Sequence, residues 1–429
     1  MSLVLLKEDT INNINEILSA KVPNYESSSK IDSIIESINN INRTTDEFVK
    51  NRFVGNTDDE DVSILDTIAK LRGSAYNVTD ILKAKKINLP NCISIGAYCF
   101  TNSMVSEIIA PECIEVYNDA FDTGTSVTLN LPKLERIYGG FRSYVYYLNL
   151  PSLKSIHINP ATDRAQIFMG EYNSTNKTIR GMIATLPLLE EIEIDNKNVV
   201  VHYNQAAISY YLFYNSQTTH VYLPSLKSIR EIVTVVELSS SNIVPQFDIW
   251  GSQYSAIKCG IEYIDMPELT EVNLKLQFDD RVNYGSLCIN SFSNSSAPYL
   301  KRVNIRNLGG SISYYNKASG PNNVHFAQTP VIELLDLGCQ SIQADGFGTT
   351  TAVSTLKTII LRNSSVCTIN STSTMIIRSL ISYEDCYVYV PAAIIEDYKA
   401  TTNWVTVADK FRAIEDYPDI VNYSMEATE

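Results

Sequence analysis

The chain has 429 residues, a formal net charge of −14 and a charged fraction of 19%. This length is too great for one ordinary compact core, so we expect several domains or one elongated array of repeats. The acidic balance argues against nucleic acid and anionic lipid as partners, because both need clustered Lys and Arg. Since no run approaches 18 consecutive apolar residues, no membrane insertion is expected either.

Residues 1–55 are predicted to form an N-terminal helical anchor, and the opening residues lack the basic region of a signal peptide. The stretch 27–53 contains neither Pro nor Gly, and its apolar residues alternate in steps of three and four. They are Ile31, Ile34, Ile38 and Ile41, continued by Thr45 and Phe48. Such a seam is typical of a coiled coil, and Ile at both core positions favours three or four strands, which predicts a homotrimer. Two helices that pack on each other or on the first repeat would explain the same pattern.

Residues 56–83 are predicted to be a helical linker. The acidic run at 58–61 is expected to be a solvated loop that leads into a helix over 64–71. Its spacing does not match that of a calcium-binding loop, so it predicts no metal site.

A motif centred on one Pro recurs through residues 84–383. An apolar residue stands two positions after each Pro, and another stands five positions after it. The eight clear copies have Pro90, Pro111, Pro132, Pro151, Pro187, Pro224, Pro267 and Pro298. Their apolar pairs are Cys92 and Ile95, Cys113 and Val116, Leu134 and Ile137, Leu153 and Ile156, Leu189 and Ile192, Leu226 and Ile229, Leu269 and Val272, and Leu300 and Val303. Three weaker copies begin at Thr329, Leu337 and Leu356.

The motif has a direct physical interpretation. Short apolar alternation before the Pro, as at Leu148 and Leu150, predicts a strand of three or four residues. Pro has no N–H for a ladder, so it ends the strand and turns the chain. The two apolar residues that follow then point inward. One such coil cannot bury its apolar side alone, whereas stacked coils bury a continuous ladder of like residues.

The motif resembles the BspA-like leucine-rich repeats, the surface-antigen type found in gut bacteria and their phages. In that family the apolar step leads to a short tail that ends in Phe, and three segments here match it: 95–100, 116–121 and 342–347. The resemblance covers about 84–416, although the spacing of 19–24 residues widens to 36, 37 and 43 in the middle. It implies an α+β repeat fold, a leucine-rich-repeat solenoid of mostly short β-strands, and recognition at an extracellular or virion surface. It carries no catalytic residues.

Residues 384–429 are predicted to be a C-terminal cap. A strand ending at Pro391, an amphipathic helix and Trp404 are similar to the closing module of such repeat proteins. A repeat array needs a polar-faced end that closes its apolar core, so Trp404 is expected to be a core residue.

The long insertions between repeats are rich in aromatic residues set among Asn, Ser and Gln. Insertions in repeat arrays map to one face, which is often the binding face, and Tyr among small polar residues is typical of recognition surfaces. The candidate ligand-binding residues are Tyr172, Tyr203, Tyr210, Tyr211, Tyr214, Trp250, Tyr254, Tyr314 and Tyr315. Packing of these rings on the flank of the array would explain the same composition.

Signatures of catalysis are missing from the sequence. The four His are far apart, and no HExxH, GxSxG, Walker or GxGxxG motif is present, so no enzyme, cofactor or metal site is predicted. Plentiful carboxylates leave a glycosidase pair open. The eight Cys are scattered without a CxxC pair and are expected to be apolar core residues, although a disulfide between Cys92 and Cys113 is conceivable.

These features together predict a non-enzymatic binding or structural protein. The first hypothesis is a fibre or receptor-binding protein on the head or tail of a phage, located at the virion surface. Its partners would be itself, other virion proteins and a host-surface glycan or protein. The alternatives are an adhesin of the bacterial cell surface and an enzyme that acts on glycans.

Overall fold

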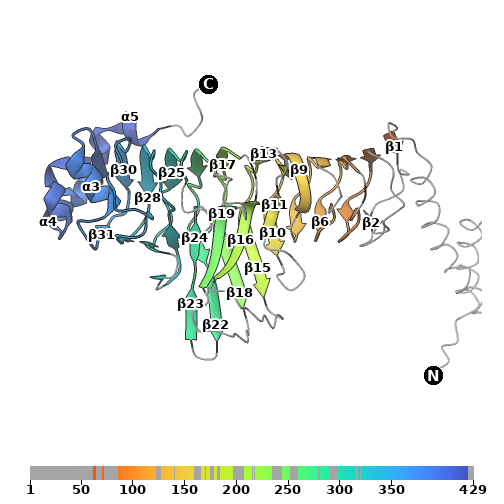
Figure 1. Ribbon diagram of the computed structural model, residues 1–429, viewed down its shortest axis with the longest axis horizontal. Coiled ribbons are helices and arrows are strands. Elements are labelled where there is room, and N and C mark those ends of the chain that lie inside the picture. Colours follow the sequence, from red (N-terminus) through yellow and green to blue (C-terminus); the bar gives the residue numbers. More distant parts are fainter. Residues whose placement is uncertain are drawn as a thin grey trace, which may run out of the picture.

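The computed structural model describes residues 61–63, 70–71 and 86–423. Gaps remain at 102, 104, 122–126, 140, 159–165, 170, 174–177, 181–183, 197–206, 215, 217, 234–243, 252–258, 279–280, 290–296, 315–316 and 319. The described part is an elongated body built of parallel sheets, with β1 near one end and α4 at the other (Figure 1).

The largest sheet has 14 strands, and each strand runs parallel to its neighbours. Its main path is β1-β3-β5-β7-β9-β11-β16-β19-β24-β27-β26-β29-β31, and β14 pairs with β9. The strands are β1 (Asp61–Ser63), β3 (Lys86–Asn88), β5 (Glu107–Ile109), β7 (Val127–Asn130), β9 (Phe141–Asn149), β11 (Gln166–Met169), β14 (Ala184–Thr185), β16 (Ala207–Tyr214), β19 (Val244–Gly251), β24 (Ser286–Cys288), β26 (Ser311–Ile312), β27 (Asn323–His325), β29 (Ser341–Ile342) and β31 (Thr368–Ile369).

Two further parallel sheets have eight and seven strands. The eight-stranded sheet contains β2 (Lys70–Leu71), β4 (Ser94–Ile95), β6 (Glu115–Tyr117), β8 (Arg136–Tyr138), β10 (Ser155–Ile158), β15 (Glu191–Asn196), β18 (Ser228–Val233) and β21 (Glu271–Asn273). The seven-stranded sheet contains β17 (His220–Tyr222), β20 (Tyr263–Asp265), β25 (Arg302–Ile305), β28 (Leu334–Leu337), β30 (Thr358–Leu361), β32 (Tyr387–Val390) and β33 (Phe411–Ala413). Two antiparallel pairs complete the strands, β12 (Glu171–Asn173) with β13 (Thr178–Arg180), and β22 (Lys275–Phe278) with β23 (Arg281–Tyr284).

The fold class expected from the sequence, an α+β leucine-rich-repeat solenoid, is wrong. The strands belong to large parallel sheets, and α-helices within the described residues occur only between 375 and 421. The segments that link successive Pro motifs are rich in β-branched and aromatic residues, which favour extended backbone. The insertions that were expected to form a binding face therefore supply the long strands β16 and β19, which pair with each other in register.

Each clear Pro copy makes a four-residue turn. In all eight, the N–H two positions after the Pro donates to the carbonyl of the residue before it, over 3.1–3.3 Å. In the first copy, for example, the Cys92 N–H donates to the Leu89 carbonyl. Pro therefore occupies the second position of a β-turn, where its fixed φ fits and its missing N–H is not needed.

The residues predicted to point inward do so. Both apolar positions of all eight copies are buried, with at most 1% of each residue exposed. The second positions pair in register across the eight-stranded sheet, in the order Ile95, Val116, Ile137, Ile156, Ile192, Ile229 and Val272. Each such burial stabilises the fold by about 1.5–3 kcal/mol. The eighth copy departs from this order, because Val303 pairs with Ile264 in the seven-stranded sheet.

All eight Cys are buried and none forms a disulfide, which confirms their role as core residues. Cys92 and Cys113 form no disulfide; each thiol instead donates to a backbone carbonyl two residues further along its own chain. Burial raises the pKa of Cys113 to about 12, so its thiol stays protonated at neutral pH.

The helical linker predicted for 56–83 is wrong where the structure describes it. Residues 61–63 form β1, which pairs with β3, and residues 70–71 form β2, which pairs with β4. This segment therefore adds one more strand to each of two sheets. The predicted coiled-coil residues Ile31, Ile34, Ile38, Ile41 and Phe48 lie outside the described residues.

The C-terminal end closes the core with helices and aromatic rings. After α3 (Met375–Ser382) and β32 come the 3₁₀ turn Ala392–Ile394, α4 (Ile395–Ala400), the 3₁₀ segments Trp404–Lys410 and Ile414–Asp416, and α5 (Pro418–Val421). Trp404 is fully buried, as predicted, and its indole N–H donates to the Cys367 carbonyl at 2.6 Å. Its ring meets Tyr398 and Phe411 at centroid distances of 5.9 and 5.5 Å.

Candidate functional site: the outer face of the eight-stranded sheet

The eight-stranded sheet turns two columns of polar and aromatic side chains away from the core. Successive side chains of a strand point to opposite faces, so the residues on either side of each buried Val or Ile share the other face. One column contains Glu115, Arg136, Ser155, Glu191 and Ser228, and the other contains Tyr117, Tyr138, His157, Glu193 and Arg230. We call these ten residues the outer face.

Three aromatic rings of the outer face form a stack. Tyr117 and Tyr138 lie 4.9 Å apart, and Tyr138 and His157 lie 5.4 Å apart, with interplanar angles of 17° and 20°. Parallel in-register pairing produces this stack, because it repeats each position about 4.8 Å along the sheet. Tyr138, the middle ring, has both faces covered by its neighbours, so the stack offers a ligand mainly ring edges, hydroxyl groups and the His157 ring nitrogens.

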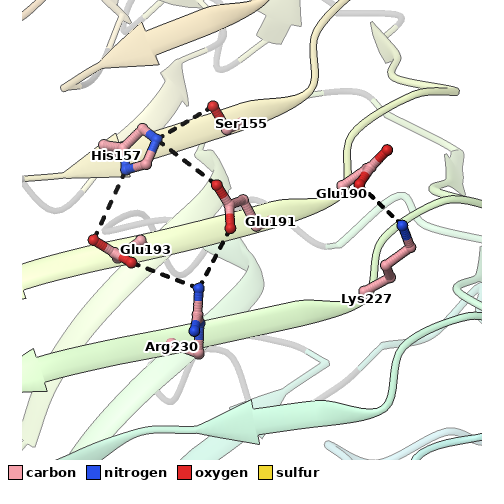
Figure 2. A network of polar contacts seen from close by, with 7 residues as sticks. All are labelled: Ser155, His157, Glu190, Glu191, Glu193, Lys227 and Arg230. Carbon is pink, nitrogen blue, oxygen red and sulfur yellow. Dashed lines mark hydrogen bonds and ion pairs between the residues drawn. The ribbon is translucent and has the colours of Figure 1, made fainter.

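A network of charged groups continues from the stack, as Figure 2 shows. His157 Nε2 lies 3.2 Å from Ser155 Oγ and 4.0 Å from Glu191 Oε1, while Nδ1 lies 4.0 Å from Glu193 Oε1. Arg230 Nη2 faces both carboxylates, at 3.3 Å from Glu191 and 3.6 Å from Glu193. The four charged or titratable side chains are 22–38% exposed, so the network remains reachable from solvent.

Exposed ion pairs flank the same strands one position earlier. Lys154 pairs with Glu135 at 2.9 Å, and Lys227 pairs with Glu190 at 2.9 Å (Figure 2 draws the second pair). The hydrogen bond from Lys154 lowers the pKa of Glu135. Such exposed pairs contribute little to stability, so their main effect is a surface that alternates in charge along the sheet.

The order Ser155, His157 and Glu193 is that of a hydrolytic triad, but the geometry is not. Nucleophilic catalysis needs a hydrogen bond that the histidine Nδ1–H donates to the orienting carboxylate, and the 4.0 Å between His157 Nδ1 and Glu193 is too long for one. The three residues also lie on an outward sheet face, where water has access to the imidazole. The arrangement therefore lacks the hydrogen-bonded triad that acyl transfer requires.

Three of the aromatic residues proposed from the sequence are in the core. Tyr210 and Trp250 are 2% and 0% exposed, and Tyr214 is 7% exposed. The Tyr210 hydroxyl donates to Glu231 at 3.1 Å, and the Trp250 indole N–H donates to the Ser216 carbonyl at 2.9 Å. Burial removes these three side chains from any surface that a ligand could reach, which corrects that part of the prediction.

The other proposed aromatic residues are scattered. Tyr211 and Tyr314 are half-buried, the first 5.1 Å from the Tyr214 ring and the second 4.9 Å from His325. Tyr172 belongs to β12, of which only the backbone is described. Outside the described residues lie Tyr203, Tyr254 and Tyr315.

The outer face was missed by reasoning from sequence, although a signal for it exists. Every member of the aromatic column stands six residues after a motif Pro, as Tyr117, Tyr138 and His157 follow Pro111, Pro132 and Pro151. Every member of the other column stands four residues after one. The repeat phase therefore marks outward positions as clearly as it marks inward ones.

Within the described ranges, no group of three or more His, Cys, Asp or Glu side chains could hold a metal ion. No helix in that part of the chain is long and apolar enough to cross a membrane. No family model matches the sequence, and no curated protein is significantly similar to it.

Proposed function

We propose that the protein is a non-enzymatic binding protein of a phage particle, a fibre or receptor-binding protein of head or tail. The observation that carries this proposal is the outer face, a continuous polar and aromatic surface assembled from the same repeat positions on neighbouring strands. In the proposal this face contacts a glycan or protein of the host surface.

The composition of the outer face supports recognition. Tyr and Arg are enriched in protein interfaces because they combine a large contact area with directed hydrogen bonds. Here both belong to strands whose inward neighbours are fully buried, so their positions are held by the core. Groups fixed in this way lose little entropy on binding.

The proposal also includes where the protein is located and how it is attached. The resemblance of the Pro motif to BspA-like repeats supports a surface location. The heptad seam at Ile31, Ile34, Ile38, Ile41 and Phe48 would join three copies or anchor the chain to other virion proteins.

Antibody labelling tests the location. An antibody raised against residues 86–423 should decorate purified phage particles in electron micrographs and should leave phage-free bacteria unlabelled. Label on phage-free cells, with none on particles, would instead establish a bacterial adhesin. A particle-free lysate that holds all of the antigen would contradict the virion proposal outright.

A further inference from the structure

A cleft of about 550 Å³ lies where the C-terminal helix α5 crosses the seven-stranded sheet. Its floor is one outward column of that sheet, Arg302, Leu334 and Thr358, which pair in register on β25, β28 and β30. One wall comes from the C-terminal segment, with Asp419, Ile420 and Tyr423. The rest of the lining comes from Glu333, Ser354, Thr355 and Lys357. The volume falls within the range of ordinary small-molecule sites.

The wall that α5 provides is held firmly in place. Arg362 donates from Nε and Nη2 to the buried Asp336 carboxylate, over 2.8–3.0 Å, and from Nη2 to the Val421 carbonyl at 2.6 Å. The Tyr423 hydroxyl donates to the same carboxylate at 3.0 Å. Val421 also packs against Ile360 of the sheet. The cleft is therefore formed before any ligand arrives, which reduces the entropy lost on binding.

The charges that line the cleft are balanced, since it has two cations and two carboxylates. Arg302 Nε lies 3.8 Å from Glu333, and Lys357 Nζ forms an ion pair with Asp385. An anionic ligand would find each cation already paired. A purely apolar ligand would strip water from four charged groups without replacing their hydrogen bonds, which is costly. The lining thus disfavours both of these ligand classes.

A neutral polyol meets the requirements of this lining. Each of its hydroxyl groups can donate to a carboxylate and accept from a cation or a hydroxyl, such as those of Ser354 and Thr358. Leu334 and Ile420 supply an apolar surface for the C–H face of a sugar ring. Next to Arg302 in the same column, Tyr263 stacks on His220 at 4.6 Å, which continues the floor beyond the cleft. We propose that this cleft binds a neutral saccharide.

This inference deepens the proposed function by naming a ligand class, and it rests on that function for its biological role. The test is isothermal titration of the full chain with millimolar galactose, glucose, N-acetylglucosamine and their disaccharides. The acidic sugars N-acetylneuraminate and glucose 6-phosphate serve as anionic probes. We expect measurable binding of at least one neutral sugar and none of the acidic ones.

Two variants locate the site. Asp419→Asn removes a carboxylate from the exposed wall, and Ser354→Trp fills the cleft from an exposed turn. Hydrogen bonds to a charged group are stronger than those to a neutral one, so Asp419→Asn should weaken binding at least tenfold, and Ser354→Trp should abolish it. Glu112→Gln, an exposed carboxylate in a turn after β5, is the matched control and should bind normally.

The inference is overturned if no neutral sugar of the panel binds, if acidic sugars bind instead, or if both cleft variants bind as well as the parent chain. Circular dichroism of each variant separates loss of binding from loss of folding. If sugar binding fails while the chain is still found on particles and still adheres to host cells through the outer face, the ligand assignment falls and the proposed function stands.

Discussion

The eight-stranded and seven-stranded sheets differ in what covers their outward side chains. On the outer face the columns are open, and His157, Arg230 and their carboxylate partners keep contact with water. On the seven-stranded sheet the C-terminal segment covers one column, so Asp336 is completely buried and Asp265 nearly so. Parallel repeats build both sets of columns by the same geometry. Whether another segment of the chain covers a column therefore decides whether its polar groups contribute to stability or are available for binding.

The largest difference between the two faces should appear when a charge loses its partner. Arg362→Met deprives the buried Asp336 carboxylate of its bidentate partner and releases the Val421 carbonyl. We expect a loss of about 3–5 kcal/mol in the free energy of unfolding, measured by urea denaturation. Adding Asp336→Asn should recover much of this loss, because the uncompensated charge disappears.

The matched change on the outer face is Arg136→Met, which removes ion pairs of 3.5 Å with Glu115 and Glu135. Both pairs are partly exposed, so we expect a loss of at most about 1 kcal/mol in the free energy of unfolding. Equal losses for Arg136→Met and Arg362→Met would show that the cover does not control the strength of these interactions.

The aromatic stack should give an intermediate effect. Tyr138→Ala removes the middle ring, which contacts both Tyr117 and His157. Stacked pairs contribute about 0.5–1.5 kcal/mol beyond the burial of their area. The free energy of unfolding obtained from thermal denaturation should therefore decrease by about that amount. Alanine at Tyr222, an exposed ring on β17, should cost less. If both substitutions have the same cost, the stack contributes nothing of its own.

The covered face should make stability fall as pH rises. Burial raises the pKa of Asp265, and the hydrogen bond from Asn304 offsets part of that rise. The folded chain therefore keeps a proton that the unfolded chain has lost, so stability decreases from about pH 4 upward until the folded-state pKa is passed. Asp265→Asn should flatten this part of a plot of unfolding free energy against pH. An unchanged slope would assign the effect to another group.

The open face should show the opposite sign and the smallest effect. Lys154 lowers the pKa of Glu135, so this carboxylate stabilises the fold above its unfolded-state pKa and loses that effect as pH falls through the folded value. Glu135→Gln removes this gain, so the free energy of unfolding should fall slightly more steeply with rising pH in that range than it does in the parent chain. The difference between the two chains should vanish at high salt. A change that persists at high salt would mean that the pair is not screened by solvent.

Local features of the repeat could be predicted from sequence. Pro at the second position of a turn and apolar residues two and five places later follow from backbone chemistry alone, and Leu153 and Ile156 are buried as expected. Trp404 is buried in the C-terminal cap for the same kind of reason. These features depend on neighbours within a few residues, so one sequence contains the information.

The fold class and the site depended on pairing between distant segments. Tyr210 and Trp250 stand in segments with many Asn, Ser and Gln residues, which suggested a surface, yet β16 and β19 pair with each other and turn these rings into the core. Within the linker expected to be helical, residues 61–63 and 70–71 form β1 and β2, because the edges of two sheets accept them. Propensity favours extended backbone in some of these segments, but it does not specify which strands pair or which side chains become buried.

Binding of the labelled full chain to intact gut bacterial isolates tests the central claim most directly. The parent chain, the double variant Tyr138→Ala with His157→Ala, and the exposed-turn control Tyr299→Ala should be compared on an isolate that the parent chain binds. If the outer face is the recognition surface, the double variant should lose at least tenfold in affinity and Tyr299→Ala should lose none. Equal binding by all three chains, with normal circular dichroism, would contradict it.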